Sequence, residues 1–426
     1  MGPDVSLARI LDVTESEPIP TRVESADASA PLTQGTVWLM AVTVAVVVAN
    51  IYYIQPLLGD IAATFGLTVA KAGSLAMLSQ AGTALGMLFF VPLGDKFPRR
   101  TLILILLAGA ILSLLLMTLA PTVAWLATGA FLLGAFGACV HVVVPLAAHL
   151  ANPAQRGRVV GTVFAGILMG VLLARTFSGM VGAWLGWRAV YGLAAGIMLA
   201  LAAVVRLYLP SPRPHVTVTW RELMGSLWSL VRRHPELRES ALLGAVLFAG
   251  FSAFWTTLVF FLGGPPYQYS TPSAAAGLFG LVGALGAVAA PQVGHLADKH
   301  GPRFTIRFAL WLTFGAFLFM GLTGWHLAGL IVGVLLMDLG VQSGHVSNQA
   351  RIYALDPAAR SRLNTVYMFC YFLGGGTGSC LGALCWHWAG WWGVCGFASA
   401  AVGLALVVEF LHGRAPKTAA SGDRVR

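Results

Sequence analysis

Charged residues are scarce in this sequence: Asp, Glu, Lys and Arg together make up 10% of its 426 residues, whereas hydrophobic residues make up 58%. Soluble domains usually carry about 25% charged residues, so the composition excludes an ordinary soluble protein. The sequence also lacks a phosphate-binding loop and a soluble portion that would house a nucleotide-binding domain. We therefore expect neither an enzyme nor an ATP-driven pump, but a protein embedded in a membrane.

Cysteine is also infrequent, and no cysteine has the spacing of a known site. The five cysteines are Cys139, Cys370, Cys380, Cys385 and Cys395. All fall in apolar runs, without the paired spacing of a zinc site or a disulfide framework. We expect them to pack in the interior, and the sequence predicts no metal and no cofactor.

Basic residues outnumber acidic ones and give a net charge of +10, which in a soluble chain would suggest a nucleic-acid partner. Here the arginines and lysines lie in short loops between apolar runs, where they set the orientation in the membrane. Nearly all fall on the side of the amino-terminal tail, and only Lys71 and Arg188 fall on the other. The pattern predicts cytoplasmic termini in a bacterial inner membrane, and no nucleic-acid partner.

Twelve apolar runs are each long enough to cross the hydrocarbon core, which takes about 20 helical residues. The runs lie at 36–58, 72–93, 101–120, 123–147, 159–182, 189–209, 241–262, 274–296, 304–323, 327–349, 363–385 and 391–411. They predict an all-α polytopic membrane protein with twelve transmembrane helices.

The second half of the chain repeats features of the first half at a constant offset. His345 corresponds to His141, and Arg360 and Arg362 correspond to Arg156 and Arg158. The repeat predicts two six-helix bundles of like topology. We expect a disordered cytoplasmic tail at 1–34, which is acidic and proline-containing, unlike a signal peptide. Four segments should follow: a bundle at 35–209, a cytoplasmic linker with an amphipathic helix at 210–240, a bundle at 241–412 and a tail at 413–426.

Two loops carry a shared signature. The loop after the second run matches the pattern Gly-x-x-x-Asp-Arg/Lys-x-Gly-Arg-Arg/Lys at Asp95, Lys96, Arg99 and Arg100, although Val91 and Pro98 replace its glycines. The second copy keeps Gly294, Asp298, Lys299, Gly301 and Arg303. Together with twelve helices and the repeat, these loops resemble those of the major facilitator superfamily. The resemblance implies a transporter that alternates its access, with the loop residues forming a cytoplasmic gate; a solvated loop that only sets topology is the other interpretation.

A narrower resemblance lies in the first run, Asn50-Ile-Tyr-Tyr53-Ile-Gln55-Pro-Leu-Leu, together with the Pro-Leu-Gly-Asp run. These residues are similar to those of a bacterial branch described as drug or metabolite exporters. That resemblance implies export, without naming a cargo.

Asp338 is an acid deep inside an apolar run, where a charge costs roughly 2.5 to 3.5 kcal/mol. Helical spacing puts Asp338, Gln342, His345 and Gln349 on one face. The superfamily's first, fourth, seventh and tenth helices line its cavity, which implies that this stripe and neighbouring Asn348 meet the substrate. Asp338 is interpreted as a proton-binding carboxylate, a counter-charge for a cation or an arginine, or a structural acid; His345 and His141 either assist proton movement or pack.

Arg175, also in an apolar run, either binds an anionic substrate, pairs with an acid as a gate, or snorkels to the interface. Further side chains supply aromatic and amide surface that suits an amphipathic organic molecule or anchors helices at the interface. They are Asn50, Tyr53, Gln55, Phe254, Trp255, Tyr367 and Tyr371.

These residues favour a secondary transporter that exports a small amphipathic compound, by proton-coupled antiport. The alternative is transport of an organic anion, a sugar or another metabolite, with Arg175 as the substrate clamp. A non-transporting receptor or scaffold belongs to a different class and would leave the buried charges without a purpose. The expected partners are a small-molecule substrate, protons and the lipid bilayer, and we expect a monomer.

Overall fold

The computed structural model of the protein describes residues 33–152, 155–210, 220–283, 301–356 and 359–413. The two predicted tails lie almost entirely outside these residues. Asp298, Lys299 and the side chain of Asp95, three members of the predicted gate, also lie outside what is described.

The first half of the chain folds into helices α1 to α8. Helix α1 (Gln34–Tyr52) continues into α2 (Ile54–Phe65), and α5 (Val123–Gly137) continues into α6 (Val140–Leu150). Between them stand α3 (Val69–Phe90), the short 3₁₀ helix η1 (Pro92–Asp95) and α4 (Arg99–Thr118), and after them α7 (Arg156–Leu185) and α8 (Trp187–Tyr208). Each of these pairs or single long helices occupies one predicted run.

The second half begins with α9 (Trp220–Arg233), which lies inside the segment predicted to link the bundles, and α10 (Pro235–Gly263). The helix Pro272–Gly283 follows, and α12 (Pro302–Thr323), α13 (Leu327–Tyr353) and α14 (Arg360–Gly413) complete the described chain. Helix α14 spans two predicted runs and is interrupted by non-helical backbone at Ala389 and Gly390.

The predicted membrane helices agree with this structure. Within the described residues, ten helices are long and apolar enough to span a membrane, and one of them is the double-length α14. The helix Pro272–Gly283 begins the predicted run at 274–296, whose remainder lies beyond the described part. The largest boundary error is at the first run, which was expected to end at 58 although the helix reaches Phe65.

Two polar residues, Asp60 and Thr64, lie in this extension. The Thr64 hydroxyl donates to the Asp60 carbonyl at 2.8 Å, and Asp60 itself is half-buried. The helix then ends at Gly66, whose φ of 62° is the left-handed conformation common at helix ends.

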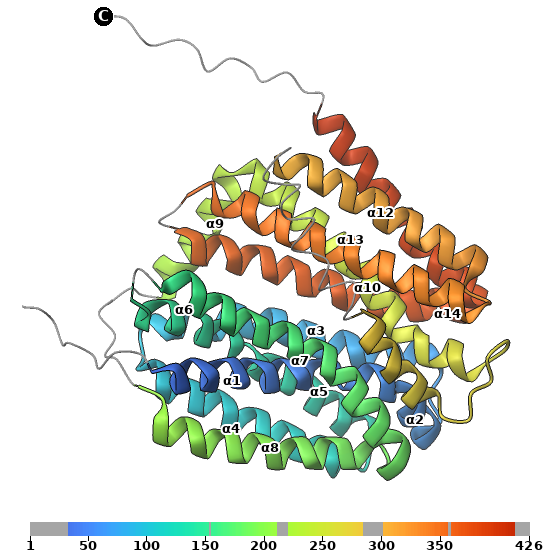
Figure 1. The fold of residues 1–426 in the computed structure, drawn as a ribbon, viewed down its shortest axis with the longest axis horizontal. Coiled ribbons are helices and arrows are strands. Elements are labelled where there is room, and N and C mark those ends of the chain that lie inside the picture. The colour runs from blue at the N-terminus through green and yellow to red at the C-terminus, as the bar shows by residue number, and fades with distance from the viewer. Residues whose placement is uncertain (1–32, 153–154, 211–219, 284–300, 357–358, 414–426) are drawn as a thin grey trace, which may run out of the picture.

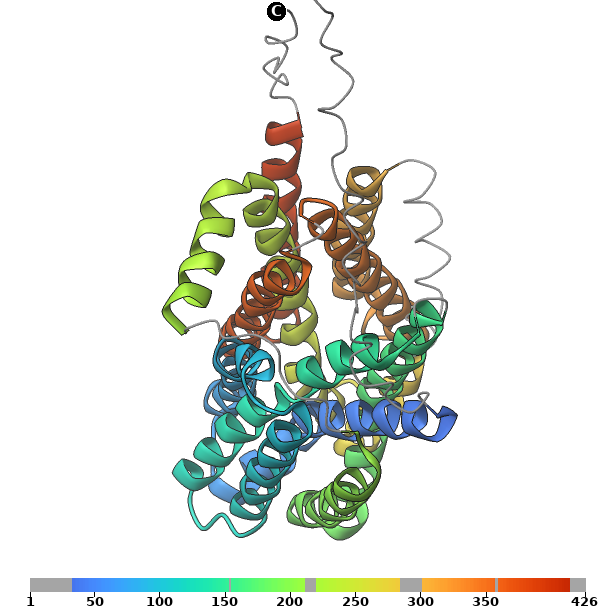
Figure 2. The same ribbon diagram turned by 90° about the vertical axis from the view of Figure 1, so that its left-hand side faces the viewer.

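The two halves of the chain lie against each other with their long helices roughly aligned (Figure 1). Figure 2 looks along the helices from the end at which α9 lies; we call this the basic end, because Arg99, Arg303 and Arg360 are also there. Helix α3 of the first half packs against α14 of the second. The two helices are close at Gly73, where an added Cβ would lie 3.0 Å from the carbonyl oxygen of Ser379.

At the end opposite the basic end, α7 packs closely on the helix Pro272–Gly283. A Cβ added to Gly277 would lie 3.1 Å from the Cα of Gly179, so small residues allow this approach. The Thr176 hydroxyl donates across the contact to the Gly277 carbonyl at 3.0 Å. The halves therefore meet tightly at this end.

Candidate functional site

A cavity of about 710 Å³ lies between the two halves. It reaches the basic end, where the exposed Arg360 and its neighbours Ser361 and Asn364 are part of the lining. Five of the predicted site residues line it: His141, Gln342, His345, Gln349 and Tyr371.

The two walls of this cavity differ in chemistry. The wall from α1, α6 and α7 is largely apolar, with His141 as a polar member; its apolar residues include Val48, Ile51, Val140, Val144, Ile167, Leu168 and Val171. The wall from α13 and α14 is rich in amides and hydroxyls, and includes Gln342, His345, Gln349, Tyr353, Asn364 and Thr365. An occupant would therefore meet hydrocarbon on one side and hydrogen-bonding groups on the other.

The polar wall is held by hydrogen bonds among its own side chains. His345 Nδ1 and the Tyr367 hydroxyl lie 3.1 Å apart. The Asn364 Oδ1 atom accepts from Tyr353 at 2.9 Å and from Gln349 at 3.2 Å. These bonds fix the amides and the imidazole before any ligand arrives.

Aromatic rings gather at the inner end of the cavity. Phe248 and Tyr371 are stacked, with centroids 4.0 Å apart and an angle of 15° between the planes. Phe251 stacks on Phe248 at 5.5 Å, and the His345 ring lies 4.6 Å from that of Tyr371. Tyr52 completes this part of the lining.

Arg175 lies behind this aromatic layer and is 2% exposed. Its Nε donates to Gln55 Oε1 at 3.0 Å, and its guanidinium carbon is 4.0 Å from the centre of the Trp255 ring. The rings of Tyr52 and Phe251 lie 5.1 and 5.3 Å from the same atom. Cation–π contacts and one amide thus stabilise a buried cation, while Nη2 has no hydrogen-bond partner within the described structure.

Asp338 is 4% exposed and belongs to the other half. Its Oδ2 atom also has no hydrogen-bond partner among the described residues, and a Cβ added to Gly283 would lie 2.7 Å from it. The same Cβ would lie 3.4 Å from Trp255 Cζ2, so the indole ring that contacts the Arg175 guanidinium also lies next to the Asp338 carboxylate. The charges of Asp338 and Arg175 interact, although the described structure gives them no direct ion pair.

The remaining predicted residues lie behind the cavity lining. Tyr53 packs on Phe177 at 5.5 Å, and Phe254 packs on Trp391 at 5.9 Å. Asn50 and Asn348 donate to the carbonyls of the preceding helical turn, at 3.0 and 2.9 Å. None of these four side chains lines the cavity in this conformation.

The lining residues that sequence reasoning missed include Tyr52, Phe248, Phe251 and Asn364. A signal for the two phenylalanines was present, because Phe248, Phe251 and Trp255 follow one another at helical spacing on α10. Tyr52 adjoins two residues that were singled out. Asn364 precedes Tyr367 and Tyr371 by one and two helical turns.

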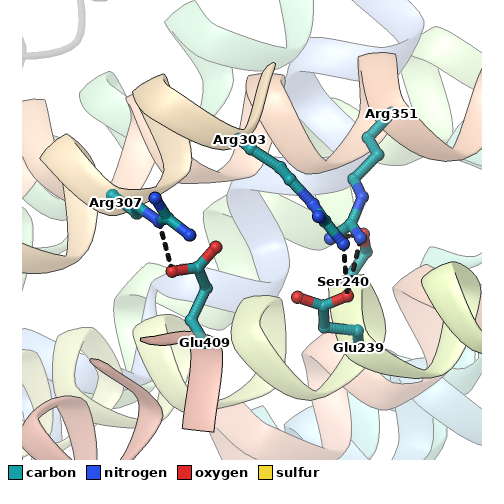
Figure 3. Close-up of polar contacts among 6 residues, drawn as sticks. All are labelled: Glu239, Ser240, Arg303, Arg307, Arg351 and Glu409. Atoms are coloured by element: carbon teal, nitrogen blue, oxygen red, sulfur yellow. Dashed lines mark hydrogen bonds and ion pairs between the residues drawn. The ribbon is translucent and has the colours of Figure 1, made fainter. Parts of the chain in front are cut away.

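Arg303, one of the predicted gate residues, belongs to a group of ion pairs in the second half (Figure 3). Arg351 donates to Glu239 at 2.6 Å, and Arg303 lies 3.7 Å from the same carboxylate. Arg307 pairs with Glu409 at 2.5 Å. All five of these side chains belong to the second half.

In the first half, the equivalent arginines donate to backbone carbonyls. Arg99 reaches the carbonyls of Gly94 and Pro145, both at 3.3 Å, and Arg100 reaches that of Leu209 at 3.3 Å. Lys96 is exposed and lies 5.9 Å from the centre of the Phe97 ring. These hydrogen bonds join helices within the first half, and the role of the two loops as a cytoplasmic gate stays a prediction.

The described residues contain no cluster of three or more His, Cys, Asp or Glu side chains that would hold a metal ion. The protonatable and hydrogen-bonding groups in and next to the cavity are the imidazoles, the amides, Arg175 and Asp338.

Comparisons with known proteins identify the family of this chain. YgaY of Escherichia coli O157:H7, which is named as a transporter, is 39% identical over 382 residues, covering 90% of this chain and 96% of the relative. A Streptomyces coelicolor protein named as a transporter, SCO4007, is 35% identical over 371 residues, covering 85% and 84%.

A crystal structure of a bacterial homologue of the human lysosomal transporter Spinster, inward-facing and unoccupied, has a similar fold. Its TM-score is 0.69 at 16% identity, and the match covers 90% of this chain and 95% of that one. The family model described as Major Facilitator Superfamily matches residues 40–350. The chain is thus a multi-pass membrane protein of a transporter family, and it belongs to the Major Facilitator Superfamily.

Proposed function

We propose that this protein is a secondary transporter of the bacterial inner membrane that exports a small amphipathic organic compound in exchange for protons. The observation that carries the proposal is the two-sided cavity between the halves, with the buried carboxylate of Asp338 just beyond its aromatic end. An apolar wall facing a polar wall suits a compound that is itself amphipathic. In this proposal the two halves rock about the cavity as a monomer, with both termini in the cytoplasm.

The orientation supports export. Arginine-rich loops mark the cytoplasmic side, and the cavity reaches that basic end. The opposite end is where α7 packs on the helix Pro272–Gly283. This conformation would therefore receive a compound from the cytoplasm, which is the side from which an exporter loads.

Asp338 is the proposed proton site. Its carboxylate is buried, lacks a hydrogen-bond partner on Oδ2 and is not locked into an ion pair. A carboxylate in such surroundings exchanges a proton at lower cost than one that is fixed by an arginine fork. Arg175 is better placed to balance Asp338 than to clamp substrate directly, since Gln55 and three aromatic rings surround its guanidinium.

The test uses proteoliposomes loaded with a deproteinised extract of bacterial small molecules. A pH gradient is imposed, and mass spectrometry identifies compounds that leave only vesicles containing the protein. We expect the gradient-driven loss to disappear in Asp338→Asn and to persist in Asp338→Glu. If no compound responds to the gradient, or if the Asn variant still couples, proton antiport through Asp338 is wrong.

A further inference from the structure

The inner end of the cavity is shaped for a flat ring. Phe248, Phe251 and Tyr371 form a stacked series with centroid distances of 4.0 and 5.5 Å and interplanar angles of 15° and 20°. Phe372 stands edge-on to Phe248 at 5.9 Å. Offset stacking of a planar ligand on such a series is favourable beyond the area that it buries.

Imidazole and guanidinium groups lie near these rings. His345 lies 4.6 Å from the Tyr371 ring, and its Nδ1 is paired with Tyr367, so Nε2 remains for a ligand. His141 faces the same cavity from the other half and is close enough to interact with His345. Arg360 contributes a guanidinium at the basic end.

A further cation, the guanidinium of Arg175, lies behind these aromatic rings. The Arg175 guanidinium contacts Tyr52 and Phe251, both of which line the cavity. Asp338 lies near this guanidinium without a direct ion pair, and its Oδ2 atom has no hydrogen-bond partner among the described residues. In a medium of low dielectric constant, the charge of Arg175 favours an anionic group over an ammonium group.

We propose that the cavity takes a planar aromatic acid, with its ring on the stack formed by Phe248, Phe251 and Tyr371 and its carboxylate at His345. The apolar wall of α1, α6 and α7 covers the far face of the ring, and the amides of α13 and α14 meet the polar edge. The inference rests on the proposed transport function and names its substrate class.

The test measures binding to the purified full-length protein in detergent by isothermal titration calorimetry, so it needs no proton gradient. Three probes share one ring system and differ in charge: 2-naphthoate, 2-naphthol and 2-naphthylmethylamine. We expect 2-naphthoate to bind roughly tenfold more tightly than the amine, with the neutral naphthol between them, as expected for one charge-assisted contact.

His345→Asn should remove most of the preference for naphthoate over naphthol. His387→Asn is the matched control, because His387 is exposed on α14 and absent from the cavity lining. The ratio of two affinities within one protein is unaffected by a partial loss of folded material. Equal or tighter binding of the amine, or no binding of any probe at millimolar concentration, overturns the aromatic-acid site while leaving gradient-driven flux to be judged separately.

Discussion

The two halves of this transporter share a similar arrangement of helices but differ in the contacts that their polar and charged side chains make. In the first half, Arg99 and Arg100 donate to backbone carbonyls, and the cavity wall is largely hydrocarbon. In the second half, arginines pair with Glu239 and Glu409, and the wall carries amides and an imidazole. The buried acid, Asp338, also belongs to the second half. Among the described contacts, the second half therefore contributes more carboxylate pairs and more hydrogen-bonding groups to the cavity wall, whereas the first-half wall is mostly apolar apart from His141.

The largest expected effect on stability comes from the ion pairs of the second half. Glu239→Gln leaves Arg351, whose side chain is 9% exposed, without its carboxylate. We expect the folded state to lose about 2 kcal/mol, as for a charged hydrogen bond that is largely buried. Thermal unfolding in detergent measures this loss, and high salt should narrow the difference from wild type.

The corresponding change in the first half should cost less. Arg100→Gln removes the donor to the Leu209 carbonyl at 3.3 Å, for which we expect about 1 kcal/mol. Its unfolding should respond less to salt than that of the Glu239 variant. A larger loss for Arg100→Gln than for Glu239→Gln would contradict the division between the halves.

The cavity walls give the next comparison. Asn364→Val deprives Tyr353 and Gln349 of a shared acceptor, so we expect a loss of roughly 1 kcal/mol and weaker binding of 2-naphthoate. Val144→Asn on the apolar wall should weaken binding of neutral 2-naphthol by a few-fold, since about one methylene's worth of apolar contact is lost. Calorimetry on both variants with both probes tests whether each wall recognises a different side of the ligand.

The smallest effect is expected at Lys96. Its ammonium is exposed and its described contact is the Phe97 ring at 5.9 Å. Lys96→Gln should change the unfolding temperature little, because exposed charge interactions are worth about 0 to 1 kcal/mol. A change as large as that of Glu239→Gln would show that the first-half loop carries a structural charge pair after all.

Helix positions were predictable because spanning a bilayer demands long apolar runs, and every described run is helical. The cavity lining was harder to predict, because an aromatic side chain in a membrane protein can pack against a neighbouring helix as well as line a cavity. Phe254 and Trp255 illustrate this difficulty. They are adjacent in sequence, so their side chains point about 100° apart around the helix. Phe254 packs on Trp391, whereas Trp255 contacts the Arg175 guanidinium.

The polar stripe on α13 was the better guide. Gln342, His345 and Gln349 line the cavity, because amides and imidazoles avoid lipid and helical spacing then puts them on one face. Arg175 illustrates the limit of this reasoning. Its burial was predictable from its cost in lipid, but its partners, Gln55 and the rings of Tyr52, Phe251 and Trp255, come from three other helices that only the folded structure brings together.

The junction between α9 and α10 has a mechanical consequence. A single residue, His234, separates the two helices, and the His234 amide still donates to the Leu230 carbonyl at 3.0 Å. Leu227 and Leu230 are buried, while Trp228 is exposed with Arg232 lying 5.0 Å from its ring. If α10 tilts as the halves rock, α9 must move with it, because a single residue leaves no slack between the two helices.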